Sequence, residues 1–172
     1  HVEAGGVRTA DGQLHELDVL VLATGFDGHS FMRPMDLTGR DGVELSDFWA
    51  EATPAHRSVS LPGFPNFFML VGPNSPIGNF SLIDISERQL GYIMQLIALW
   101  RGGEASEISA KQDAADRFNA ALKEAMKDTV WGTGCQSWDL DKNGNPAMWP
   151  FSFDRFCADM SAPDLEEYEL VS

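Results

Sequence analysis

The residues best suited to ligand chemistry form one loop, Gly-Pro-Asn-Ser-Pro-Ile-Gly at residues 72–78. An apolar run at 67–71 precedes this loop and predicts a buried strand, and a helical pattern over about 82–101 follows it. The first amides of such a helix have no partner within it, and the helix dipole adds partial positive charge there. Loop and helix could therefore bind an anion or an electron-rich ring. An ordinary strand-to-helix loop is the simpler alternative.

A second motif ends an apolar run near the N-terminus. Val-Leu-Val-Leu at residues 19–22 predicts a short strand buried on both faces. Ala23, Thr24 and Gly25 then reduce the side chains to almost nothing. At the carboxyl end of a strand in an open α/β sheet, such small residues let another backbone or a flat cofactor approach closely. A buried strand that ends in a glycine turn is the alternative without a function.

A third block, over residues 130–156, is rich in aromatic residues and glycine. It contains Gly-Cys-Gln-Ser-Trp-Asp at 134–139 and an Asn-Gly pair at 143–144. Asn-Gly is typical of a tight hairpin turn, so the block predicts an aromatic C-terminal hairpin. Its tryptophans Trp131, Trp138 and Trp149 are expected in the core.

Taken in this order, the three blocks resemble one known family, the flavin-containing and Baeyer–Villiger monooxygenases (class B flavoprotein monooxygenases). Asp-x-x-x-x-Ala-Thr-Gly-Phe-Asp at 18–27 is similar to the family segment that leads from the NADP domain back to the FAD domain. Gly-Pro-Asn at 72–74 resembles the segment beside the isoalloxazine ring. Gly-Cys-x-Ser-Trp at 134–138 resembles a block whose tryptophan contacts the ribose region of NADP.

The resemblance implies FAD and NADP as cofactors of the parent enzyme. The cofactor-binding residues that it implies are Thr24, Gly25, Gly72, Pro73, Asn74, Ser75, Pro76, Ser137 and Trp138. The residues that it implies to face the substrate are Ile77, Gly78, Asn79 and Phe80. Thr24 and Gly25 are assigned to linkage between domains near the cofactor. We expect no catalytic residue and no metal site in this chain.

The activity implied by the resemblance is oxygen insertion. NADPH reduces FAD, O2 adds to form a C4a-peroxyflavin, and one oxygen atom passes to a small organic substrate by Baeyer–Villiger or heteroatom oxygenation. The chain lacks the glycine-rich dinucleotide fingerprints, so we expect a fragment that neither holds FAD tightly nor turns over alone. Two alternatives stay open: a flavin reductase-like member without oxygen transfer, and a non-catalytic interaction or scaffold domain derived from the same fold.

The overall composition narrows the partners. The chain of 172 residues has 26 acidic and 12 basic residues and a formal charge of −14, which argues against nucleic acid or an anionic membrane as a partner. It has two cysteines, no signal peptide and no apolar run long enough to cross a bilayer, so a cytoplasmic location is expected. The resemblance implies a small-molecule substrate and O2 as partners. A homodimer is left open.

The expected fold class is α/β, or α+β for the fragment by itself, as the C-terminal part of a two-dinucleotide-binding-domain FAD/NAD(P) fold. Residues 1–27 would form the last hairpin and strand of the NADP domain plus the linker. Residues 28–172 would form the returning half of the FAD domain. The Asp-Gly pair at 11–12 predicts the turn of the N-terminal hairpin. The acidic residues at 163–172 predict a frayed tail.

Three helices are expected. Ser46 could cap a short helix that contains Phe48 and Trp49. Ser81 and Asp84 predict a capping box for the helix over 82–101. Its expected buried residues are Ile83, Leu90, Ile93, Met94, Ile97 and Trp100. The third helix, over about 110–127, is expected to begin at Ser109 with Gln112 in the capping-box position. Its expected buried residues are Ala114, Phe118, Ala121, Leu122, Ala125 and Met126.

Overall fold

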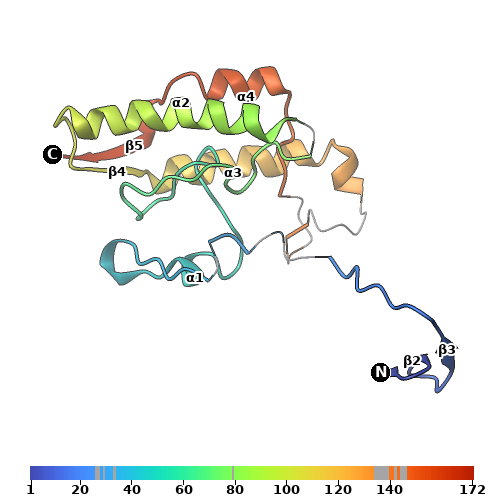
Figure 1. Cartoon of the computed structure of the whole chain (residues 1–172). Coiled ribbons are helices and arrows are strands. Elements are labelled where there is room, and N and C mark those ends of the chain that lie inside the picture. The colour runs from blue at the N-terminus through green and yellow to red at the C-terminus, as the bar shows by residue number, and fades with distance from the viewer. Residues whose placement is uncertain are drawn as a thin grey trace.

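A computed structural model of the chain describes residues 1–25, 28, 30–32, 34–78, 80–133, 140–141, 143 and 147–172. Helices and short strands alternate along the chain, which confirms the mixed helix-and-strand class (Figure 1). The strands are β1 (Val2–Glu3), β2 (Gly6–Arg8), β3 (Leu14–Glu16), β4 (Glu107–Ala110) and β5 (Tyr168–Val171). The α-helices are α1 (Leu45–Phe48), α2 (Leu82–Arg101), α3 (Gln112–Met126) and α4 (Phe153–Asp159). Three short 3-10 helices are η1 (Arg40–Gly42), η2 (Val130–Thr133) and η3 (Leu165–Glu167).

The main core joins the three longest helices to the β4–β5 ribbon. Its buried side chains come from α2, α3, α4 and both strands, and Trp149 packs among them. Figure 1 shows α2 and α4 on one side of this body and α3 below them. A second, smaller core lies at α1 and contains Leu45, Leu61 and Met69. Burial of these aliphatic and aromatic groups is the main stabilising contribution to the fold.

The C-terminal segment is part of this core. Strand β5 pairs antiparallel with β4, with Ala110 opposite Tyr168 and Glu107 opposite Val171. The expectation of a frayed acidic tail over 163–172 is therefore wrong. Tyr168 is buried, so a sheet ladder and an aromatic anchor outweigh the high local charge.

The predicted N-terminal hairpin is confirmed, but its turn differs from the predicted two-residue turn. Strands β1, β2 and β3 form an antiparallel sheet in sequence order. The loop is longer than two residues: Gly12 N donates to Thr9 O, and Thr9 N donates to Gln13 O. Gly12 has a φ of 84°, which is typical of a type I turn followed by a glycine bulge. In Figure 1 the hairpin lies apart from the helical body at the end of an extended segment.

The two predicted buried strands are wrong. Residues 19–22 belong to no strand, and Val21 is 76% exposed. Such an apolar strand needs a neighbour on each edge and cover on both faces, and no described residue pairs with it. In the run 67–71, only Phe68 makes a bridge, to Ser60. Positive φ angles at Asn66 and Val71 bend this segment out of strand geometry.

Helix α2 confirms its predicted bounds and cap, because the Ser81 side chain accepts a hydrogen bond from Asp84 N. Its buried face agrees with the prediction only at Ile93, which is buried, and at Ile97, which is partly buried against the core. Ile83, Leu90, Met94 and Trp100 are exposed, and the buried residues are Ile85, Gln89, Tyr92, Ile93 and Leu96. Both sets have helical spacing, so periodicity alone did not decide which of the two faces the core.

The other helices confirm their existence and correct their ends. Helix α1 begins at Leu45, so Ser46 lies inside it and Glu44 is the N-cap. Ser109 lies in β4, and α3 starts at Gln112 with Lys111 as N-cap. In α3, Ala114, Leu122 and Met126 are buried as predicted, and Ala121 is exposed.

The predicted C-terminal hairpin over 130–156 is corrected at both ends. Val130–Thr133 is a 3-10 helix, and the segment ends inside α4, whose N-cap Ser152 accepts a hydrogen bond from Arg155 N. Asn143 is described, but the rest of the predicted turn at 143–144 and most of residues 134–146 lie outside the described residues. Trp149 is in the core as expected, and Trp131 is only half-buried.

Candidate functional site

The candidate loop at 72–78 is held tightly on its inner side. Gly72 is buried, and a Cβ on it would overlap the carbonyl oxygen of Ser58. Pro73, Ser75 and Pro76 are buried as well. Ser75 N donates to Gly72 O at 3.1 Å, which closes the loop as a turn. The small first residue is therefore required by close packing of two backbones.

Two asparagines fix the middle of the loop. Asn74 has a φ of 64°, a left-handed conformation that asparagine tolerates better than most residues. Its side chain donates to Asn119 Oδ1 at 3.4 Å, and Asn119 donates to Ala55 O at 3.1 Å. The loop is thus connected to α3 as well as to α2.

Gln89 was missed in the sequence, although it makes the strongest side-chain contacts to the loop. Its Oε1 accepts from Val71 N at 2.7 Å, and its Nε2 donates to Ser75 Oγ at 3.0 Å. Gln89 is fully buried on α2. The signal in the sequence was a lone amide side chain one helical turn from Ile85 and Ile93, which form the buried face.

The end of the loop leads to the exposed first turn of α2. Gly78 is exposed, and the amides of Leu82 and Ile83 lie in the first turn of α2, where a helix offers no internal partner. Leu82 and Ile83 expose their side chains beside these amides, Ile83 to 72%. Donors next to apolar surface fit a flat, electron-rich ring such as a flavin.

The structure brings only part of the predicted site together. Gly72, Pro73, Asn74, Ser75, Pro76, Ile77 and Gly78 form one loop, as described above. Phe80 is half-buried and stacks on Phe153 with ring centroids 4.7 Å apart, so it packs into the core. Thr24 and Gly25 are exposed in the extended segment after the N-terminal hairpin. Asn79, Ser137 and Trp138 lie outside the described residues.

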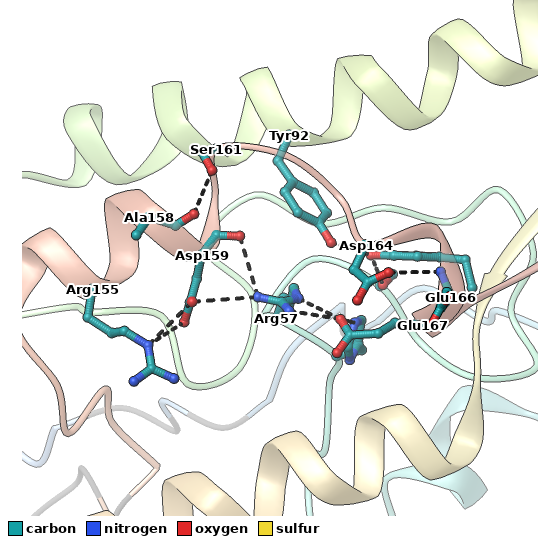
Figure 2. Close-up of polar contacts among 12 residues, drawn as sticks. Arg57, Tyr92, Arg155, Ala158, Asp159, Ser161, Asp164, Glu166 and Glu167 are labelled. Atoms are coloured by element: carbon teal, nitrogen blue, oxygen red, sulfur yellow. Dashed lines mark hydrogen bonds and ion pairs between the residues drawn. The ribbon is translucent and has the colours of Figure 1, made fainter.

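A second polar cluster lies between α4, η3 and residues 56–60 (Figure 2). Arg57 Nε donates to Glu167 Oε2 at 2.9 Å, and Arg57 Nη1 lies 3.8 Å from Asp159 Oδ1. Arg155 also contacts Asp159, at 3.3 Å. The two guanidinium groups, of Arg57 and Arg155, balance the two carboxylates, so the cluster works as a structural connection between the chain's middle and its C-terminus.

Three buried aromatic side chains extend this cluster. His56 is fully buried, with Nε2 3.1 Å from Glu167 Oε2. Burial lowers the pKa of His56 to about 4, against an opposing effect of Glu167, and Arg57 lowers it further. Tyr92 and Tyr168 place their hydroxyl oxygens 3.0 Å apart, and burial raises the pKa of both phenols. Their hydrogen bonds and ion pairs are to residues outside the candidate loop, so we assign these groups to stability.

The described residues contain no group of three His, Cys, Asp or Glu side chains placed to hold a metal ion. Within the same part of the chain, no helix combines the length and apolar character that a membrane span requires.

Fold and site together define a mixed helix-and-strand chain with a candidate cofactor loop at the start of its longest helix. No family model matches the sequence. Individual relatives do match. An uncharacterized monooxygenase of Mycobacterium tuberculosis is 51% identical over 99% of this chain and 34% of its own length. A Baeyer–Villiger monooxygenase of Streptomyces coelicolor is 35% identical over 99% of this chain and 33% of its own length.

Solved structures give the same result. Cyclohexanone monooxygenase from Rhodococcus sp. Phi1, bound to NADP+, superimposes with a TM-score of 0.82 at 29% identity, over 98% of this chain and 33% of that chain. A closed structure of cyclohexanone monooxygenase gives a TM-score of 0.83 at 30% identity. The chain belongs to the family of Baeyer–Villiger and FAD-binding monooxygenases. It spans about a third of the length of the relatives it matches.

Proposed function

We propose that this chain works as part of an FAD- and NADPH-dependent monooxygenase that transfers one oxygen atom of O2 to a small organic substrate. The observation that carries the proposal is the loop at 72–78, which Gln89 holds on its inner side and which leads into the exposed first turn of α2. The relatives named as Baeyer–Villiger and FAD-binding monooxygenases support the same assignment. A ketone is the substrate class that those relatives favour.

In the proposed reaction, electrons and atoms balance. NADPH gives up a hydride, one oxygen atom of O2 enters the substrate, and the other leaves as water after taking up one further proton from solvent. FAD, when bound, supplies the chemistry that joins these half-reactions. The protein's own task is to position this group and to exclude water from it.

The residues of the loop have distinct proposed roles. The open amides of Leu82 and Ile83 would donate toward negative charge on the ring, because the helix dipole favours an anion there. Pro73 and Pro76 would fix the loop backbone, since proline restricts φ. Ile77 and Gly78 would face the substrate. Thr24, Gly25, Ser137 and Trp138 are assigned to cofactor binding by the resemblance alone.

The division of the chain is part of the proposal. Residues 1–27 would complete the NADP domain and the linker, and residues 28–172 would return to the FAD domain. The separation of the N-terminal hairpin from the helical body supports this division (Figure 1). The exposed apolar segment at 19–22 is consistent with a strand that pairs with sheet residues outside this chain.

The test is a two-part measurement. Full-length protein that contains this chain is purified with FAD, and NADPH oxidation and product formation are followed with ketone, sulfide and amine panels. We expect a stoichiometric flavin spectrum and an ester or lactone product from a ketone. The 172-residue chain alone is expected to bind no flavin. NADPH oxidation without an oxygenated product would favour a flavin reductase, and absence of bound flavin in the full-length protein would overturn the proposal.

A further inference from the structure

Gln89 joins the residue before the candidate loop to the middle of the loop through one amide group. Its carbonyl oxygen accepts from Val71 N at 2.7 Å, just before the loop. Its Nε2 donates to Ser75 Oγ at 3.0 Å, three residues after Gly72. Gln89 and Ser75 are both fully buried, so the hydrogen bond between them is shielded from solvent, and the one to the half-buried Val71 is partly shielded.

The backbone at Val71 needs such a partner. Val71 has a φ of 54°, a left-handed conformation that is unfavourable for a β-branched residue. Its amide therefore points away from any strand ladder. Gln89 Oε1 accepts from this amide, which lies in a half-buried residue and has no other partner among the described residues. The hydrogen bond thus stabilises a backbone conformation that the sequence would not choose locally.

Because Gln89 lies on α2, its hydrogen bonds to Val71 and Ser75 tie the loop to this helix. The residue lies two helical turns after the N-cap Ser81, on the rigid helix whose first turn carries the open amides. Anchoring Val71 and Ser75 to this helix fixes the loop relative to those amides. A shift of the loop would change its position relative to the first turn of α2 without changing the helix itself.

We propose that Gln89 is a positioning residue for the cofactor-facing loop. It sets the distance between residues 72–75 and the first turn of α2. The inference deepens the proposed function and rests on it wherever flavin is concerned. The part of the inference that does not concern flavin, namely that Gln89 holds the loop in place, depends only on its hydrogen bonds to Val71 and Ser75.

The first measurement uses the 172-residue chain and needs no flavin. Gln89→Met keeps the length and removes both hydrogen bonds. Amide hydrogen exchange at Val71 is expected to accelerate about tenfold or more, because this amide loses its acceptor. Exchange at Ser75, whose amide donates to Gly72 O, is expected to accelerate as well, because the loop loses its anchor on α2. The matched control is Gln95→Met, at an exposed site on the same helix where the side chain reaches Ser161 O. The control is expected to leave both loop amides unchanged.

A double-mutant cycle isolates the pair. Ser75→Ala removes the hydroxyl that accepts from Gln89, and the effect of Gln89→Met on amide exchange at position 75 is expected to be smaller in that background. Unchanged exchange at Val71 in Gln89→Met, with the chain folded by circular dichroism, would overturn the positioning role whatever the flavin results are.

The second measurement uses full-length protein with FAD bound. In Gln89→Met at full FAD occupancy, a larger share of NADPH oxidation is expected to end in hydrogen peroxide, with NADPH, one proton and O2 giving NADP+ and H2O2. A purely structural role would lower yield or thermal stability and leave this share unchanged, which would overturn the link to flavin. Wild-type protein without flavin would overturn the proposed function instead, and the exchange result would still decide whether Gln89 holds the loop.

Discussion

Arg57 and Glu167 are joined across 110 residues of chain: Arg57 Nε donates to Glu167 Oε2 at 2.9 Å, and Nη2 lies 2.8 Å from the same oxygen (Figure 2). Arg57 itself has a φ of 50°, so this pair also supports an unfavourable backbone conformation. The contact connects the turn at 56–60 to η3, and through it to the β4–β5 ribbon.

Breaking this pair is expected to destabilise the chain. Glu167→Gln removes the negative charge beside a half-buried guanidinium, which should lower the free energy of unfolding by about 2 kcal/mol. The measurement is urea denaturation at pH 7. Glu124→Gln is the control, since Glu124 pairs with Lys127 on the open surface of α3 and such pairs contribute little. Equal losses in the two variants would contradict the structural role of Arg57 and Glu167.

His56 is expected to make the fold sensitive to acid. Its pKa is lowered to about 4 in the folded chain, chiefly by burial, and is about 6.5 when unfolded. Between these values the unfolded chain binds more protons, so stability is full above pH 6.5 and falls as the pH drops toward 4. The loss amounts to at most about 3 kcal/mol.

The variant His56→Gln removes this titration. The difference in unfolding free energy between wild type and His56→Gln should change across pH 4 to 6.5 and be constant above it. His15→Gln, in the exposed hairpin, is the matched control and should leave the pH dependence as it is. A parallel pH profile in wild type and His56→Gln would show that His56 is not held neutral by the fold.

The two tyrosines are expected to stay protonated until the chain unfolds. Tyr92 and Tyr168 are the only tyrosines in the sequence, and both are buried with raised pKa values. Burial is the main cause for each, since it disfavours the phenolate. In an alkaline titration, absorbance at 295 nm should therefore rise together with the loss of helical circular dichroism. A phenolate signal in the folded chain would place at least one tyrosine in contact with water.

Two glycines on either side of the loop–helix junction should respond in opposite ways to the same substitution. Gly72→Ala places a Cβ against Ser58 O and should destabilise the chain by about 1–3 kcal/mol. Gly91→Ala adds a Cβ on α2 with no atom within 4 Å and should stabilise it by about 0.5–1 kcal/mol. Thermal melts of both variants check this pair. Stabilisation by Gly72→Ala would mean that the loop does not approach Ser58.

The sequence by itself determined the local elements of this protein. The cap at Ser81 and the turn at Gly12 depend on neighbouring residues, so their positions could be read directly. The loop at 72–78 was identified in the same way, from turn residues before a helix. The three ordered blocks also carried the family assignment, which the relatives confirm.

Only the tertiary structure decided which faces meet. Gln89 became the partner of Val71 and Ser75 because packing against α3 and β4 turned that face of α2 inward, leaving Ile83 exposed. Residues 19–22 have the composition of a buried strand and stay exposed, since a strand is completed by partners and no described residue supplies one. The C-terminal segment shows the opposite case, because it has a strand partner, β4, about 60 residues earlier in the chain. The hydrogen bonds of this ladder stabilise the segment more than its negative charge destabilises it.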